Sequence, residues 1–233
     1  ALACLDLLVK LGVKKENIWV TDIAGVIYEG RTEEINDYNI RYSQKTSARV
    51  LDDVIGGADV FLGVSAPRVL TPDMVRKMAK KPLILALANP TPEITPEEAR
   101  KARPDAILAT GRTDYPNQVN NVLCFPYSFR GALDCGATAI NDEMKMACVH
   151  ALAELTQAES DEIVAEAYGG QDLKFGPDYI IPKPFDPRLL VELAPAVAKA
   201  AMDTGIATRP IEDFTTYRQK LTDFVFRSGT VMK

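Results

Sequence analysis

Apolar and polar positions along the chain follow two patterns, and together they predict alternating helices and strands. Short runs without charge, typical of buried parallel strands, occupy residues 60–65, 82–88 and 106–110, and a shorter β-prone run covers 18–21. Segments in which apolar residues recur at helical spacing lie between these runs or after them. We expect helices over 2–11, 50–55, 72–79, from 96 onward, 142–156, from 187 onward and 211–226.

Capping residues support several of these helix boundaries. Thr71 followed by Pro72 is typical of a helix start, as is the Thr95-to-Glu98 capping box. Gly12 suits the position just after a helix end. The polar stretch 29–45 and the Gly/Pro-rich segment 169–187 are expected to be connections, the former with a short helix.

This order of elements predicts an α/β fold with a doubly wound, Rossmann-like, mostly parallel sheet flanked by helices and followed by C-terminal helices. The opening helix 2–11 is apolar over most of its surface, and such a helix usually follows a strand and packs on a sheet. We therefore expect the chain to start inside a domain whose first strand and glycine-rich turn are absent.

Composition narrows the classes of function. The 233 residues carry 27 basic and 32 acidic side chains, a net charge of −5, which disfavours a nucleic-acid-binding protein. No apolar run approaches the roughly 20 residues that span a bilayer, and no signal peptide opens the chain. The single histidine, His150, makes triads and multi-histidine metal sites hard to build. The four cysteines are expected to be buried free thiols of a cytoplasmic protein: Cys4, Cys124, Cys135 and Cys148.

In doubly wound folds, ligands bind outside the carboxyl ends of the strands. Asp22 ends the first visible strand, where a dinucleotide-binding fold places an acid that accepts hydrogen bonds from the adenosine ribose. An ordinary loop aspartate explains this residue equally well, because the GxGxxG motif that should precede the opening helix is not in the chain. The small residues that end the next strand allow close approach of a flat cofactor or form a tight turn: Gly63, Val64, Ser65 and Ala66.

Amide side chains follow the next two strands. Asn89 precedes Pro90, which restricts it to extended geometry, and it could hold a carboxylate or a carboxamide or form part of a turn. Asn120 and Asn121 come after the fourth visible strand. Amides with few titratable neighbours are typical of substrate orientation rather than acid–base catalysis. The acid, the base and the metal ligands would then come from elsewhere.

Five segments together resemble the nucleotide-binding half of malic enzymes, closest to the bacterial type often fused to a phosphotransacetylase-like domain. The resemblance covers nearly the whole chain, and ANP and YPNQVNNVLCFP are its most specific parts. The segments are VTDIAGVIYEGR (20–31), LDDVIGGADVFLGVSAPRVLTPDMV (51–75), LALANPTPEITPEEA (85–99), ATGRTDYPNQVNNVLCFPYSFRGALDCGATAINDEMKMA (109–147) and FGPDYIIPKPFDPRL (175–189).

The resemblance implies oxidative decarboxylation of (S)-malate to pyruvate and CO2 with a nicotinamide cofactor and a divalent metal, Mg2+ or Mn2+. Hydride transfer from C2 comes first, then decarboxylation, then protonation of the enolate, with the metal acting as a Lewis acid. By motif, Asp22 would bind the adenosine ribose and residues 63–66 would line the cofactor. Asn89, Asn120 and Asn121 would hold the nicotinamide side and the malate carboxylates. Residues 1–157 would form the dinucleotide-binding domain and 158–233 the C-terminal connection and helices.

Several expectations follow for what the chain lacks. The family's tyrosine acid, lysine base, acidic metal ligands and glycine-rich turn would all precede Ala1, so we expect residues 1–233 alone to be inactive. We further expect three partners: an upstream malic-enzyme domain, other copies of the same protein in a homo-oligomer, and a fused C-terminal phosphotransacetylase-like domain. We expect neither nucleic acid nor a membrane as a partner. Asp22 favours NAD through a free 2′-hydroxyl, and Ile23 supplies neither hydroxyl nor charge for the phosphate of NADP.

Two rival functions stay open at this point. An amino-acid or other 2-hydroxy-acid dehydrogenase could use the same scaffold, although it would want a catalytic lysine near the strand ends. A nucleotide-sensing or regulatory Rossmann module is the non-enzymatic alternative, and titration with NAD, NADP or acetyl-CoA would separate it from the enzyme.

Overall fold

The structure, a computed structural model, describes residues 1–158 and 173–227. Its contacts divide the chain into two compact units, Ala1–Tyr115 and Pro116–Lys233, and each unit is described by itself. The expected division into a dinucleotide-binding domain, 1–157, and a C-terminal part, 158–233, is a division by function and stays a prediction. Part of the expected 169–187 connection lies outside the described residues.

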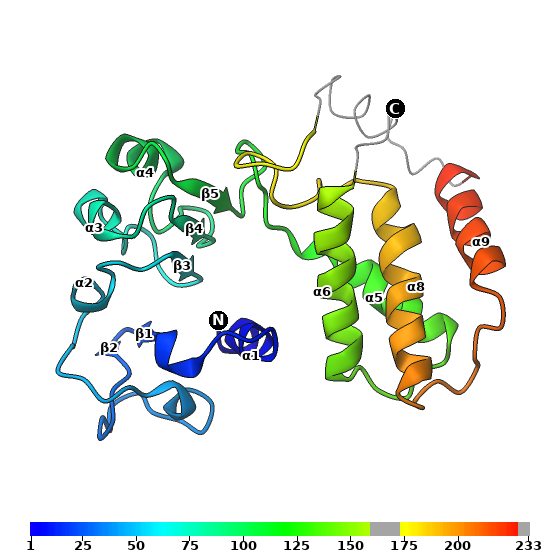
Figure 1. The fold of residues 1–233 in the computed structure, drawn as a ribbon, viewed down its shortest axis with the longest axis horizontal. Coiled ribbons are helices and arrows are strands. Elements are labelled where there is room, and N and C mark those ends of the chain that lie inside the picture. Colours follow the sequence, from blue (N-terminus) through cyan, green and yellow to red (C-terminus); the bar gives the residue numbers. More distant parts are fainter. Residues whose placement is uncertain (159–172, 228–233) are drawn as a thin grey trace. The chain divides into compact units, whose positions relative to one another are not determined.

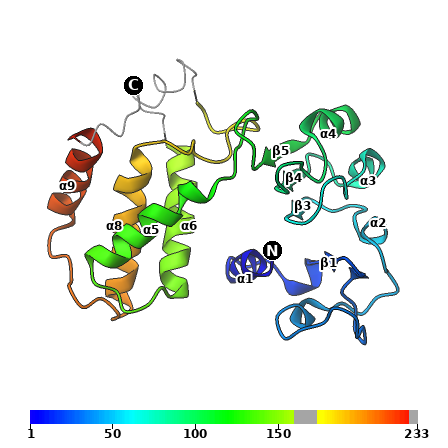
Figure 2. The same ribbon diagram turned by 180° about the vertical axis from the view of Figure 1, so that it is seen from behind.

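A parallel three-stranded sheet forms the centre of the first unit, as the charge-free runs predicted. Its strands β3 (Val60–Gly63), β4 (Leu83–Ala86) and β5 (Ile107–Thr110) lie in sequence order. Helix α3 (Pro72–Lys77) connects β3 to β4, and α4 (Pro96–Ala102) connects β4 to β5 (Figure 2). This strand–helix–strand order confirms the predicted α/β class.

One face of this sheet is closed by a hydrophobic core. Phe61, Ile84 and Leu108 are paired across the three strands and point to the same side, where Val75 of α3 and Ala99 of α4 cover them. At the alternate strand positions, Leu62, Leu83, Leu85 and Ile107 are only half-buried, whereas Ala109 is buried. The core therefore fixes the sheet from one side and holds the strand ends in register.

Side-chain caps begin both connecting helices where the sequence predicted them. The Thr71 hydroxyl accepts a hydrogen bond from the backbone N–H of Met74. Thr95 and Glu98 form the complete capping box, in which each side chain accepts from the other residue's backbone N–H. These bonds satisfy N–H groups that a helix start leaves without an intrahelical partner.

The β-prone run near residue 20 folds differently from the prediction. It gives β1 (Thr21–Asp22), which pairs antiparallel with β2 (Gly25–Val26) in a separate two-stranded sheet. Gly25 has a φ of +94°, and the Asp22 carboxylate accepts from the Ala24 N–H, so the sequence TDIAG closes a tight turn. Local turn chemistry thus outweighs the strand-like pattern that suggested a fourth parallel strand.

The remaining elements of the first unit are short. Helix α1 (Leu2–Lys10) ends before Gly12, whose φ of +102° confirms its predicted place after a helix end. The expected short helices are α2 (Leu51–Val54) and η2 (Ile40–Tyr42), and η1 (Lys15–Asn17) was not predicted. No residue of α1 is buried.

The second unit is helical. Helix α8 (Arg188–Asp203) packs against α5 (Phe125–Asp134), α6 (Asp142–Gln157) and α9 (Phe214–Arg227), and the short η3 (Asn121–Leu123) precedes α5 (Figure 1). The inner stripe predicted for α8 is buried as expected, and it consists of Leu190, Leu193, Val197 and Ala201. These C-terminal helices share one hydrophobic core.

Pro195 lies inside α8 and leaves the carbonyl of Val191 without its usual helical donor. Arg218 of α9 supplies the missing donor, because its guanidinium donates to the Val191 oxygen at 2.9 Å. The same guanidinium donates to Glu192 at 2.6 Å. A single arginine therefore both repairs the backbone of α8 and attaches α9 to it.

Helix α5 was not predicted, and its sequence contains Pro126 and Gly131, two residue types that are unfavourable inside a helix. Pro126 occupies the first turn, where a missing N–H costs nothing. Gly131 faces α8, and a Cβ at this position would lie 2.3 Å from the backbone oxygen of Ala194. The glycine thus marks a close helix–helix contact rather than a helix break.

The cysteine prediction is confirmed in part. All four thiols are free, and Cys135 and Cys148 are buried. Cys124 is only half-buried and Cys4 is exposed on α1, so the expectation of burial is wrong for Cys4.

Candidate functional site

The predicted ligand edge of the first unit lies where β3 and β4 end. Gly63 and Ala86 are paired across the two strands, so the loops that follow them leave the sheet at the same edge. Gly63 itself is buried, whereas Val64, Ser65 and Ala66 are exposed beyond it. Asn89 is also exposed, three residues past the end of β4. The structure therefore brings the predicted residues 63–66 and Asn89 to one edge with free access.

A buried carboxylate that the sequence analysis missed joins these two loops. Glu93 is 0% exposed, and its Oε1 accepts from the backbone N–H of Ser65 at 2.9 Å and from the Ser65 hydroxyl at 3.3 Å. Its Oε2 accepts from the backbone N–H of Ala88 at 3.0 Å. Nothing in the segment TPEIT distinguishes this glutamate from a solvated loop residue, because its partners are distant in sequence.

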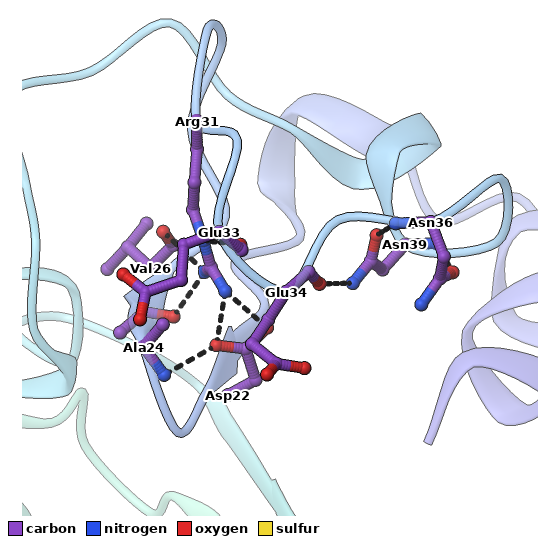
Figure 3. A network of polar contacts seen from close by, with 9 residues as sticks. Asp22, Ala24, Val26, Arg31, Glu33, Glu34, Asn36 and Asn39 are labelled. Carbon is purple, nitrogen blue, oxygen red and sulfur yellow. Dashed lines mark hydrogen bonds and ion pairs between the residues drawn. The ribbon is translucent and has the colours of Figure 1, made fainter.

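Asp22 is held by Arg31 in the hairpin of the first unit (Figure 3). The Arg31 Nη2 donates to both carboxylate oxygens, at 2.5 and 2.6 Å. The Arg31 side chain is 2% exposed and that of Asp22 28% exposed. The carboxylate is therefore oriented by the guanidinium yet still reachable by a ligand.

Arg31 is occupied by the protein on every side. Its Nη1 donates to the carbonyls of Gly25 and Val26, both at 3.0 Å, and its Nε donates to the carbonyl of Glu33 at 2.8 Å. With the two bonds to Asp22, all five guanidinium N–H donors have acceptors. Arg31 thus fixes the hairpin and the acid, and it has no donor left for a ligand phosphate.

The second unit holds the other predicted amides. The Asn120 carbonyl oxygen accepts from the Val122 N–H at 3.0 Å and so caps η3, while Asn121 is exposed. The Asn120 amide nitrogen can still donate to a ligand. Because Asn89 belongs to the first unit, a common site for the three amides stays a prediction.

Asn117 of the same PNQVNN motif has a role that was not foreseen. It is 2% exposed, its Nδ2 donates to the Pro177 carbonyl at 2.7 Å, and its Oδ1 accepts from the Ile180 N–H at 2.8 Å. Asn117 has a φ of 53°, a region that asparagine tolerates better than most residues. It therefore fastens the loop that carries the motif to residues 177–180.

Lys183 lies in the segment that follows this fastened loop. It is half-buried, and desolvation lowers its pKa below the usual value for lysine. A lysine in such surroundings is more readily neutral than one on the surface.

Comparison with known proteins decides the family. Residues 4–166 match the model of the malic enzyme NAD binding domain. The chain belongs to the malic enzyme family. It is 64% identical over its whole length to an NADP-dependent malic enzyme of Salmonella typhimurium and 62% identical to an NAD-dependent malic enzyme of Rhizobium meliloti. It spans about a third of these relatives, 31% and 30% of their lengths.

A solved malic enzyme agrees in fold as well as in sequence. The crystal structure of malic enzyme from Pyrococcus horikoshii is 33% identical, with a TM-score of 0.78. The match covers 97% of this chain and 51% of the solved one. The predicted Rossmann-like class and the resemblance to malic enzymes are thereby confirmed.

Two further findings bear on the malic enzyme interpretation. Within residues 1–158 and 173–227, no group of three or more His, Cys, Asp or Glu side chains is arranged to hold a metal ion, so these residues do not fit a metal centre by themselves. Among the described helices, none combines the length and apolar character needed to cross a membrane.

Proposed function

We propose that this chain is the dinucleotide-binding part of an enzyme that oxidatively decarboxylates (S)-malate to pyruvate and CO2. The observation that carries the proposal is the match of the whole chain to malic enzymes at up to 64% identity. The open strand edge of the first unit, lined by small residues and the exposed amide of Asn89, supports it.

Each of the proposed site residues has a role that follows from its position. Asp22, oriented by Arg31, accepts a hydrogen bond from the adenosine ribose. Residues 63–66 line the cofactor, and Asn89 holds its nicotinamide side. With Asn120 and Asn121, Asn89 also orients the malate carboxylates. The bound nicotinamide supplies the hydride acceptor.

NAD is the proposed cofactor over NADP. Asp22 carries a carboxylate where NADP has a phosphate, and Arg31 has no N–H left to donate to that phosphate. Ile23, next to Asp22, is 95% exposed and supplies neither hydroxyl nor charge. Measuring kcat/KM for both cofactors with the full-length protein tests this choice, and a preference for NADP would refute it.

Metal and acid–base groups are proposed to come from residues outside this chain. The relatives are about three times as long, which leaves room for an upstream malic-enzyme domain and for a phosphotransacetylase-like domain. We include Mg2+ or Mn2+ dependence, a homo-oligomer and a cytoplasmic location in the proposal. Dialysis of the full-length protein against EDTA should abolish activity, and added Mn2+ should restore it.

Residues 1–233 alone are expected not to oxidise malate. The reason is that the tyrosine acid, lysine base and metal ligands of the family have no counterparts matched in this sequence. Purified chain should give no malate-dependent absorbance at 340 nm with either cofactor. Sustained NAD(P)H formation by the pure chain would contradict this part of the proposal.

A further inference from the structure

The Glu93 carboxylate has surroundings that set it apart from the other acids of the first unit. It is the side chain of a loop residue, yet it is fully buried, between the buried Ile94 and the loop that follows β3. Its backbone is also anchored, because its carbonyl accepts from the Leu70 N–H at 3.2 Å. Burying a carboxylate costs free energy unless hydrogen bonds satisfy it. The three donors that face the Glu93 carboxylate therefore indicate its role.

Those donors come from two different strand ends. Ser65 follows β3 and offers a backbone N–H and a hydroxyl, while Ala88 follows β4 and offers a backbone N–H. Ser65 and Ala88 are separated by 23 positions in sequence, and among the residues that the structure describes Glu93 alone bonds to both. The next residue after Ala88 is Asn89. The carboxylate thus sets the spacing and direction of both loops at the proposed cofactor edge.

The neighbouring glycine shows how closely this carboxylate is seated. A Cβ on Gly63 would lie 2.5 Å from the Glu93 Cδ and 2.6 Å from its Oε1. The same Cβ would lie 2.7 Å from the Phe61 Cε1. Gly63 has an ordinary φ, so its lack of a side chain makes room for Glu93 and the Phe61 ring rather than serving the backbone conformation. Gly63 therefore contributes to the site by admitting the carboxylate, in addition to any direct role with the cofactor.

A carboxylate, rather than an amide, suits this position. Both Glu93 oxygens accept from N–H groups, one on each loop. A glutamine would place its NH2 group against one of the two backbone N–H donors and would lose that loop. Bonds from N–H groups to a carboxylate are also stronger than neutral ones.

We propose that Glu93 is a positioning residue for the dinucleotide: it holds Ser65 and the Ala88–Asn89 segment in the orientation that receives the cofactor. This inference rests on the proposed function, because it assumes that the β3–β4 edge binds NAD(P). Glu93 acts through the two loops and does not itself contact the cofactor.

The test is steady-state kinetics of E93Q in the full-length enzyme, with cofactor varied at saturating malate. We expect the KM for NAD(P) to rise at least about tenfold, the loss expected for one charge-assisted hydrogen bond. A purely structural role would lower the amount of active enzyme, and hence the apparent kcat, and leave the KM unchanged. An unchanged KM for E93Q would therefore overturn the proposal.

Two further variants keep the test decisive. E93D retains the charge on a side chain one methylene shorter, and its KM for NAD(P) should lie between those of wild type and E93Q. If E93Q does not fold, E93D alone decides: a KM equal to that of wild type would overturn the proposal. E97Q is the matched control, because Glu97 is exposed four residues further on and accepts from the Tyr115 hydroxyl. Its KM should be that of wild type.

The proposed function is judged separately by the wild-type enzyme in the same assay. If wild type reduces NAD(P) with malate and E93Q behaves identically, the positioning role fails alone. If wild type does not reduce NAD(P) with malate, the proposed function fails, and direct titration of wild type and E93Q with NADH fluorescence then tests whether Glu93 orders a nucleotide site at all.

Discussion

Two carboxylates of the first unit, Asp22 and Glu93, show how partners decide what an acid does. Asp22 faces a guanidinium and remains 28% exposed, so it is oriented and still able to accept from a ligand. Glu93 faces N–H and O–H donors and is fully buried, so it can only organise the loops around it. The same chemical group therefore serves contact at one position and geometry at the other.

Replacing Arg31 tests the orientation of Asp22. R31Q removes a 2% exposed guanidinium and leaves the Asp22 carboxylate and three carbonyls without the Arg31 donors. We expect a loss of about 2–3 kcal/mol in unfolding free energy, less than for a fully buried pair because the Asp22 carboxylate is partly solvated. Urea unfolding followed by circular dichroism measures it.

R41Q is the matched control for this variant. Arg41 pairs with Asp6 in the same unit, but the two side chains are 40% and 35% exposed. Such surface pairs contribute below about 1 kcal/mol. Equal losses for R31Q and R41Q would show that burial of the Arg31 pair does not matter to stability.

In the second unit, a side chain of α9 supplies a hydrogen bond that the backbone of α8 lacks. Pro195 removes a helical donor from α8, and Arg218 of α9 replaces it at the Val191 carbonyl. An interhelical contact of this kind couples the backbone of α8 to the presence of α9. The helices are therefore expected to lose stability together rather than one at a time.

R218M tests this coupling. It leaves the Val191 carbonyl without its donor and should lower the unfolding free energy by about 1–2 kcal/mol. In a P195A background the loss should shrink, because the new N–H can bond to the same carbonyl. K199M is the control, since Lys199 and Asp203 form an exposed pair on α8 worth below about 0.5 kcal/mol. An unchanged R218M effect in the P195A background would contradict the repair.

Acid stability is set by carboxylates at the ends of elements. Hydrogen bonds from the Thr95 hydroxyl and N–H lower the pKa of Glu98, and bonds from Arg103 and then the Lys81 N–H lower the pKa of Asp105. A carboxyl whose pKa is lower in the folded than in the unfolded state adds stability above its unfolded pKa, about 4, and this stability is lost as the pH falls through the folded pKa.

The expected result is a urea midpoint that falls as the pH is lowered from 5 toward 2. The double variant E98Q/D105N should show a shallower fall, because two of the titrating groups are gone. The matched control is E16Q/D59N, which removes two exposed acids of the same unit. A urea midpoint that rises on acidification would contradict this prediction.

For the whole molecule, the sequence pattern predicted the three parallel strands and most helices, because periodicity and capping act over a few residues. That a ligand binds where these strands end stays a prediction. It could not find Glu93 or Arg31, whose partners are chosen by tertiary packing and leave no periodic signal. Helix α5 was not among the predicted helices, and the close contact with Ala194 explains the glycine, Gly131, within it. The Asp22 strand was assigned to the wrong sheet because the TDIAG turn closes a hairpin.

The central claim is that this chain binds the dinucleotide in an enzyme that oxidises and decarboxylates malate. The most direct measurement is the product balance of the full-length protein given (S)-malate, NAD and Mn2+. We predict one NADH, one pyruvate and one CO2 for each malate consumed. NADH formed with oxaloacetate as the final product, or no NADH from either cofactor, would contradict the account.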